Sequence, residues 1–147
     1  LIGNMAYLWI FGNNIEDYLG HVSFLIFYLF CGICATTIHI ISDFDSVIPV
    51  VGASGAISGI LGAYLILYPK AKVKLLVWFG IVTILRVKAS IVLIFWFIYQ
   101  FISVFKSSGE GGGVAWWAHI GGFIAGLFVI FLLEKKKLVE KEKSPWE

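Results

Sequence analysis

The sequence predicts an all-α membrane protein, a polytopic bundle of helices that cross a lipid bilayer. Its 147 residues are 60% hydrophobic and only 14% charged, which is too apolar for a soluble domain of this size. Several apolar stretches reach the roughly 17 to 25 residues that a spanning helix needs. The basic residues are clustered between these stretches, a pattern that sets membrane topology and does not indicate nucleic-acid binding.

Two helices are predicted in the amino-terminal part. Residues 1–11 are apolar and end before Gly12, Asn13 and Asn14, so they form the last part of a spanning helix. Residues 22–41 contain no charged side chain and are long enough for a full span. The chain opens inside an apolar stretch with no initiator Met, so we expect it to be a fragment whose amino-terminal part is missing.

The middle of the chain is less regular. Small residues begin at Gly52 and lead to a short predicted helix over 52–68, which ends before Pro69 because proline disfavours helical geometry in the residue ahead of it. Residues 75–85 are apolar but too few to cross a bilayer. Basic residues lie on both sides of this segment, so we expect it to lie in the membrane interface on the side of those residues.

Two more spanning helices are predicted at 89–105 and 116–133, joined by a loop rich in Ser and Gly. The last helix stops at Glu134, and residues 135–147 form a charged tail. Both basic clusters fall on one side of the bilayer if each of these helices crosses once, and the positive-inside rule makes that side cytoplasmic. The clusters are Lys70, Lys72, Lys74, Arg86 and Lys88, and Lys135, Lys136, Lys137, Lys141 and Lys143.

This topology predicts an integral multi-pass protein of the cell membrane with a cytoplasmic carboxyl-terminal tail. The helices at 52–68 and 116–133 then begin at the opposite, outer face. Every Asp and Glu falls in a predicted loop or tail, whereas a transporter or channel is expected to carry charged groups inside its spans. The spans hold hydroxyls, histidines and small residues instead, which directs attention to nucleophilic catalysis.

One face of the helix at 52–68 is nearly bare backbone. At about 100° per residue, five small residues fall within an arc of roughly 140°. They are Ser54, Gly55, Ser58, Gly59 and Gly62. A surface of this kind packs closely against another helix, and packing alone is the simplest explanation for it.

The last helix carries a matching bare face. His119, Gly122 and Gly126 lie within about 60° of one another on the helical wheel. Packing the two faces together brings the Ser54 hydroxyl and the His119 imidazole to a similar depth near the outer ends of their helices. A neutral imidazole can take the serine proton during nucleophilic attack and return it to the leaving amine, so the two residues form a candidate catalytic dyad.

The other histidines compete with His119 for this role. His21 opens the second helix at the cytoplasmic end, across the membrane from Ser54, and its depth excludes it. His39 lies toward the outer end of the same helix, so depth does not exclude it as the base. Asp43 and Asp45 lie in an outer loop, where nothing ties them to His119 as orienting groups.

Four separated motifs resemble the rhomboid family of intramembrane serine proteases. They are Gly3-Asn4-Met5 with Trp9-Ile10-Phe11-Gly12-Asn13; Gly52-Ala53-Ser54-Gly55; Tyr68-Pro69-Lys70-Ala71; and Ala118-His119-Ile120-Gly121-Gly122 with Gly126. They occur in the family's order and cover nearly the whole chain. The resemblance implies a six-span core of which five spans are present, with a protease domain over 1–134 and a cytoplasmic tail over 135–147.

The resemblance also implies the roles of individual residues. It selects His119 as the general base and Ser54 as the nucleophile, and it makes Asn4 and the Ser54 backbone amide the donors of the oxyanion hole. Gly52, Gly55, Gly59, Gly62, Gly122 and Gly126 are then expected to pack the helices. The implied activity is cleavage of transmembrane protein substrates within the bilayer, with no cofactor and no metal.

Two departures from the family pattern accompany the match. The family usually has a histidine four residues before the asparagine, one position ahead of Leu1. Ser58 stands where some members place an aromatic ring against the catalytic histidine. The competing hypothesis on the same fold is a catalytically inactive rhomboid-like protein that binds membrane clients, although the presence of both Ser54 and His119 argues against it.

Overall fold

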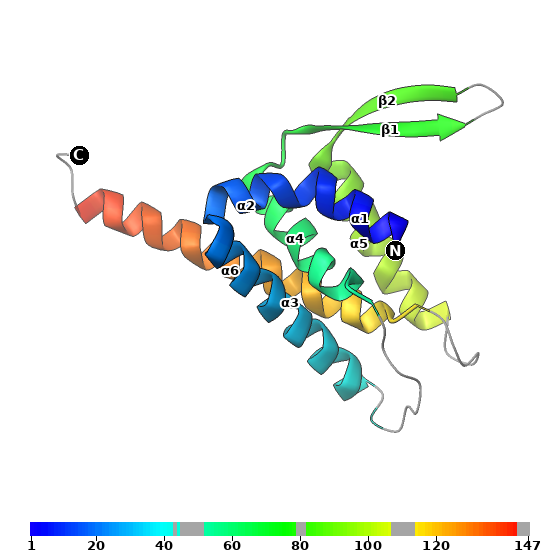
Figure 1. Ribbon diagram of the computed structural model, residues 1–147, viewed down its shortest axis with the longest axis horizontal. Coiled ribbons are helices and arrows are strands. Elements are labelled where there is room, and N and C mark those ends of the chain that lie inside the picture. The colour runs from blue at the N-terminus through cyan, green and yellow to red at the C-terminus, as the bar shows by residue number, and fades with distance from the viewer. Residues whose placement is uncertain (43, 45–51, 79–81, 107–113, 144–147) are drawn as a thin grey trace.

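The computed structural model is a helical bundle with one β-hairpin (Figure 1). It describes residues 1–42, 44, 52–78, 82–106 and 114–143, with side chains up to Leu138 in the last segment. The elements are α1 (Ile2–Tyr7), the π-helix η1 (Leu8–Gly12), α2 (Asn13–Leu19), α3 (His21–Ser42), α4 (Ser54–Leu67), β1 (Lys72–Trp78), β2 (Val82–Lys88), α5 (Ala89–Lys106) and α6 (Trp116–Lys143).

Three helices among the described residues are long and apolar enough to cross a membrane, namely α3, α5 and the Trp116–Leu138 part of α6. The predicted polytopic helical bundle is therefore confirmed. The helix α4 is apolar but has only 14 residues. At about 1.5 Å per residue it rises roughly 21 Å, less than the roughly 30 Å hydrocarbon core of a bilayer.

The short helix α4 lies at the centre of the bundle. Ten consecutive residues of it, from Gly55 to Tyr64, are buried. Figure 1 shows α4 between the α1–α2 segment, α3 and α6, and α5 contacts it more sparingly. A helix that is apolar on all sides is stable only when it is enclosed in this way, by protein or by lipid.

Glycines let the backbones of α4 and α6 touch. A Cβ atom placed on Gly62 would lie 2.1 Å from the Phe123 carbonyl oxygen, and one on Gly126 would lie 1.9 Å from that of Gly59. Real Cβ atoms do not approach other atoms so closely, so only glycine fits at these two positions. Small residues at helix interfaces are the usual means of close packing in membranes, where the hydrophobic effect gives no drive for helix association.

The helix α3 joins this contact from a third side. A Cβ atom on Gly59 would lie 2.4 Å from the Cys31 sulfur, and one on Gly55 would lie 2.7 Å from the Ala35 Cβ. Cys31 and Ala35 are themselves buried on α3. The bare face of α4 is therefore divided between α6 and α3, and the three helices pack closely against one another.

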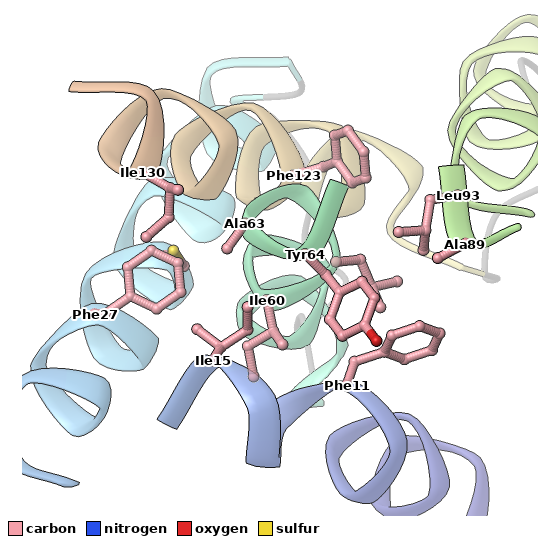
Figure 2. Packing of buried hydrophobic residues seen from close by; sticks show 12 residues of the cluster. Phe11, Ile15, Phe27, Ile60, Ala63, Tyr64, Ala89, Leu93, Phe123 and Ile130 are labelled. Atoms are coloured by element: carbon pink, nitrogen blue, oxygen red, sulfur yellow. The ribbon is translucent and has the colours of Figure 1, made fainter. Parts of the chain in front are cut away.

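The amino-terminal helices cover the opposite side of α4. Figure 2 shows Phe11 and Ile15 packed toward Ile60 and Tyr64. The rings of Phe11 and Tyr64 meet edge to face with 5.0 Å between their centroids, a favoured aromatic geometry. This apolar contact extends along α4 away from Ser54.

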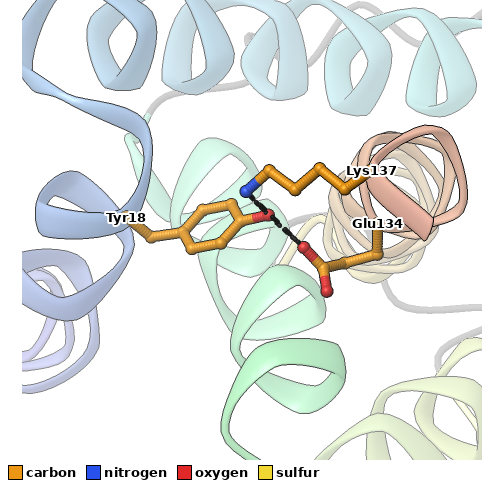
Figure 3. Close-up of polar contacts among 3 residues, drawn as sticks. All are labelled: Tyr18, Glu134 and Lys137. Atoms are coloured by element: carbon orange, nitrogen blue, oxygen red, sulfur yellow. Dashed lines mark hydrogen bonds and ion pairs between the residues drawn. The ribbon is translucent and has the colours of Figure 1, made fainter. Parts of the chain in front are cut away.

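Polar contacts hold the helices together at the end of the bundle remote from Ser54, here called the basic end. Lys137 Nζ donates to the Tyr18 hydroxyl at 2.6 Å, and that hydroxyl donates to the Glu134 carboxylate (Figure 3). Burial, and then the hydrogen bond to Glu134, raise the pKa of Tyr18, so it remains a protonated donor. The Tyr68 hydroxyl donates to the Asn14 carbonyl oxygen at 3.2 Å at the same end.

The segment 75–85 differs from the sequence prediction. Its described parts, residues 75–78 and 82–85, belong to the two strands of an antiparallel β-hairpin, in which Val73 pairs with Val87 and Leu75 with Leu85. β-Branched residues are frequent in both strands and favour this pairing. From the sequence, the segment is predicted to lie in the membrane interface, and no strands are predicted there.

The boundaries of two helices also differ. Helical structure does not stop at Gly12, because the π-helical turn η1 carries it into α2, which ends at Leu19 before Gly20. The last helix does not stop at Leu133 and continues to Lys143, so part of the predicted tail is helical. The polar residues after Gly12 predict that the chain leaves the first helix there. In the structure these residues belong to α2, at the basic end of the bundle.

Replacing Gly126 with alanine tests the backbone contact between α4 and α6. The added methyl group overlaps the Gly59 carbonyl, so we expect a loss of about 1–3 kcal/mol, the usual cost of overpacking. Thermal unfolding in detergent micelles measures the change. Gly3→Ala is the matched control, because a Cβ atom there meets nothing within 4 Å. Equal stability of Gly126→Ala and the native chain would contradict the packing described.

Candidate active site

Ser54 is the first residue of α4 and is half-buried. The residue two positions before it, Gly52, has a φ of 134°, a conformation that side-chain-bearing residues rarely adopt. Gly52 was expected to pack helices, but a Cβ atom there would be in ordinary contact at most, 3.7 Å from Ser54 Oγ. Its role is to let the chain turn into α4, and this turn leaves Ser54 at the accessible end of the helix.

His119 lies in the first turn of α6, is buried, and meets Ser54. Its Nε2 atom is 2.9 Å from the Ser54 hydroxyl oxygen. The glycine contact next to this pair explains its depth, since a Cβ atom on Gly122 would lie 2.0 Å from the Gly55 carbonyl oxygen. Gly55 follows Ser54 directly, and Gly122 lies three residues after His119, so the close contact of the backbones brings the two side chains together.

A third residue, Gln100, holds the other side of the imidazole. Gln100 lies on α5, only 3% of its surface is exposed, and its side-chain oxygen Oε1 is 2.7 Å from His119 Nδ1. An amide oxygen can only accept a hydrogen bond, so Nδ1 carries the ring proton of the neutral imidazole. Nε2 is then the unprotonated nitrogen and accepts the hydroxyl proton of Ser54.

Gln100 is not among the residues predicted from the sequence. The sequence offers no third acid near His119 and therefore predicts a dyad. The available signal was that Gln100 is the only glutamine of the chain and stands inside an otherwise apolar span. Polar groups at such positions are expensive and are usually paired with one another or serve a function.

Two tryptophans flank the imidazole. The ring centroids of Trp96 and His119 are 5.9 Å apart, and those of Trp116 and His119 are 6.3 Å apart with the planes nearly perpendicular. Aromatic support for His119 therefore comes from α5 and from the start of α6. Ser58, at the position where some family members have an aromatic ring, is buried, and its hydroxyl donates a hydrogen bond to the Ser54 carbonyl oxygen at 2.7 Å.

The structure does not bring the remaining candidates into this group. Asn4 lies half-buried on α1, which contacts α4, but its side chain makes no hydrogen bond to another described residue. Nδ1 of His39 is buried without a hydrogen-bond partner in the described part of the chain. His21 is exposed and is bonded to Glu16 at 2.6 Å. Asp43 and Asp45 lie outside the described residues.

Both cysteines lie on α3. Cys31 is buried under Gly59, Cys34 is half-buried, and both are free thiols. No group of three or more His, Cys, Asp or Glu side chains able to hold a metal ion occurs within the residues that the structure describes.

The geometry is suited to one kind of chemistry. A hydroxyl on the accessible end of a helix faces the lone pair of a neutral imidazole, whose other nitrogen is held by an amide. A nucleophile, a base and an orienting group in this order are the parts needed for attack on a carbonyl carbon. In addition, the Ser54 backbone N–H is one of the donors that a helix leaves unpaired in its first turn.

Comparisons with known proteins agree with the resemblance in the sequence motifs. The family model described as Rhomboid domain matches residues 1–136. Rhomboid protein 1, mitochondrial, from Saccharomyces cerevisiae is 34% identical over 79 residues, which cover 51% of this chain and 23% of that protein. The chain thus spans about a quarter of the length of this curated relative. No solved structure gives a significant match.

The family match extends from the first residue through α1 and α4 to the basic end of α6, and so includes both residues of the Ser54–His119 pair. The three apolar helices long enough to span a membrane, together with this match, make the chain an integral membrane protein. On this evidence the chain belongs to the rhomboid family.

Proposed function

We propose that the chain is an intramembrane serine endopeptidase that cleaves transmembrane protein substrates. The observation that carries this proposal is the 2.9 Å contact between Ser54 Oγ and His119 Nε2, with Nδ1 held 2.7 Å from Gln100. A client-binding protein of the same family has no need of an aligned hydroxyl and imidazole. The proposal rests on this alignment together with membership of a family whose members are generally proteases.

The reaction begins when Ser54 Oγ attacks the carbonyl carbon of the scissile peptide bond. His119 Nε2 takes the hydroxyl proton as the carbon–oxygen bond forms, and it then delivers this proton to the leaving nitrogen as the peptide bond breaks. The acyl-enzyme is hydrolysed when His119 takes a proton from a water molecule that attacks the ester, and Ser54 regains its hydroxyl proton. Atoms and protons balance with no cofactor.

The developing negative charge on the carbonyl oxygen needs donors. The Ser54 backbone N–H is available because it lies in the first turn of α4, where helix N–H groups lack partners within the helix. We propose the Asn4 side chain as the second donor, because the family resemblance gives an asparagine at this position that role and α1, which carries Asn4, contacts α4. Donors that meet the oxyanion only in the transition state raise kcat and leave KM little changed.

We also propose an orientation and a membrane. The basic end, with Lys70 and Lys135, lies at the opposite end of the bundle from Ser54, so the positive-inside rule places Ser54 toward the outer face of the cell membrane and the tail in the cytoplasm. A substrate helix then enters from the lipid and unwinds near its outer end before Ser54 attacks.

Substitutions of His119 and Ser54 test the base and the nucleophile, with His39→Gln as the matched control for the histidine. The single variants His119→Gln and Ser54→Ala should each reduce cleavage of a transmembrane substrate in detergent by at least about 10³-fold, since nucleophile and base act as a unit. His39→Gln and the buried-serine variant Ser103→Ala should retain activity close to that of the native chain. Cleavage that survives Ser54→Ala would overturn the assignment of Ser54 as the nucleophile, whereas substrate binding without cleavage by the native chain would identify a client-binding protein.

Substitution of Gln100 tests its positioning role. Gln100→Leu leaves the Nδ1 proton of His119 unpaired in a buried site, which costs about 1–3 kcal/mol and should lower kcat by roughly 10- to 100-fold. Gln100→Glu keeps an acceptor oxygen for Nδ1 and should lose less kcat than Gln100→Leu, while its buried carboxylate lowers the stability of the fold.

Nitrogen-15 NMR of labelled histidine gives a second readout for Gln100. The His119 ring should be protonated at Nδ1 in the native chain and in a mixture of tautomers in Gln100→Leu, with His119→Gln used to assign the signals. A merely structural role would leave the tautomer unchanged, so an unaltered tautomer in Gln100→Leu would contradict the assignment.

The oxyanion assignment predicts a kinetic effect of Asn4→Ala. Loss of one donor should lower kcat by about 10²- to 10³-fold with little change in KM. The matched control is Asn14→Ala, because only the backbone carbonyl of Asn14 takes part in a described hydrogen bond, with Tyr68. Unchanged kcat in Asn4→Ala would remove Asn4 from the proposed site without affecting the Ser54–His119 pair.

A further inference from the structure

The β-hairpin has one face whose side chains are all exposed, here called the hairpin face. Successive side chains of a strand point to opposite sides, and the register pairs each exposed residue of β1 with an exposed residue of β2. The pairs, from the base of the hairpin outward, are Lys72 with Lys88, Lys74 with Arg86, Leu76 with Ile84, and Trp78 with Val82.

The base of the hairpin face holds four positive charges. Lys72 stands directly opposite Lys88, and Lys74 directly opposite Arg86, an arrangement of like charges that destabilises a strand pair. Over the part of the chain that the structure describes, no carboxylate pairs with any of these four residues. An anion from outside the chain would relieve the repulsion.

The outer half of the hairpin face is apolar and uncovered. Leu76 is 73% exposed, Trp78 79%, Val82 64% and Ile84 59%. The other side of the hairpin is also apolar apart from Thr83, since it carries Val73, Leu75, Val77, Leu85 and Val87. Such a hairpin has little independent stability in water, where two strands need a further apolar partner.

The hairpin leaves the bundle at the basic end. Its base is tied to α5, because the Ala89 N–H donates to the Ala71 carbonyl oxygen at 2.7 Å. Figure 1 shows the two strands projecting sideways from the helices rather than folding back over them. Cations at the base and apolar side chains farther out therefore meet the region where a bilayer surrounds the spanning helices.

We propose that the hairpin face binds anionic lipid headgroups. Lys72, Lys74, Arg86 and Lys88 contact the lipid phosphates, and Trp78 reaches the boundary between headgroups and acyl chains, where tryptophan is enriched in membrane proteins. The hairpin stays in this interfacial layer because the unpaired backbone groups along its two edges cannot enter the hydrocarbon core. This binding is independent of the proposed protease activity.

Tryptophan quenching in nanodiscs tests the proposal on the full chain. The emission of Trp78 is obtained as the difference between the native chain and Trp78→Phe, in discs of phosphatidylcholine with or without phosphatidylglycerol. Lipids brominated at shallow or deep acyl positions report its depth. We expect shallow quenching that is strong in the anionic discs at low salt, and weak in zwitterionic discs or at high salt.

Substitutions of cations on and off the hairpin separate lipid binding by the hairpin face from the effect of the net charge of the chain. Each cation near an anionic surface changes the ratio of lipid-bound to free hairpin by about fivefold. The double variant Lys74→Gln/Arg86→Gln should therefore lower this ratio by roughly 25-fold. Lys106→Gln/Lys135→Gln removes the same charge away from the hairpin and should leave the quenching unchanged. Thermal unfolding in the same discs confirms that each variant is folded.

Three outcomes would overturn the proposal. Equal quenching in anionic and zwitterionic discs would show that the cations do not select the lipid. Quenching by the deep bromines alone would place the hairpin in the hydrocarbon core. An unquenched Trp78, together with polyglutamate binding that depends on Lys74 and Arg86, would identify an acidic protein segment as the occupant.

Discussion

Contact between the bare backbones of α4 and α6 is the constraint on which the rest of the structure depends. The carbonyls of Gly55 and Gly59 occupy the space that side chains at Gly122 and Gly126 would fill. Any side chain in this contact would push the helices apart, whereas a hydrogen bond from serine to imidazole tolerates only a few tenths of an ångström beyond 2.9 Å. Packing and site geometry are therefore the same requirement, and α3 with Cys31 and Ala35 encloses it from a third side.

The hydrogen bonds around Ser54 and His119 are made by neutral side chains. A carboxylate next to His119 would place a charge in a buried, lipid-surrounded site, where an incompletely paired charge is costly. Gln100 supplies the oxygen without the charge, and Ser58 satisfies its own hydroxyl on the Ser54 carbonyl. Charged contacts are displaced to the basic end, where Tyr18, Glu134 and Lys137 meet near water. The arrangement follows from the solvent around the protein as much as from the reaction.

The helices and the Ser54–His119 pair could be predicted from the sequence, because length, hydropathy and small residues are local signals and both bare faces can be read from a helical wheel. The pair is expected because Ser54 and His119 lie at a similar depth in the membrane, and the residues alone do not exclude His39 as the base. The hairpin escaped prediction because both its faces are apolar beyond the base, so Leu75 to Trp78 show no alternation of polar and apolar residues. Gln100 and the flanking Trp96 escaped because their contacts depend on how α5 is rotated against α6, which only tertiary packing determines.

The shortness of α4 has a consequence for where a peptide bond could be reached. In the proposed orientation the Tyr68 end of α4 lies at the cytoplasmic interface, so the roughly 9 Å by which α4 falls short of the hydrocarbon thickness lies at the Ser54 end. An extended chain covers that depth with about three residues at roughly 3.3 Å each. In the proposed reaction, the length of α4 thus defines the register of cleavage: the bond lies about three residues inside the membrane boundary of the substrate, and lengthening α4 by one turn would move that position by about 5 Å.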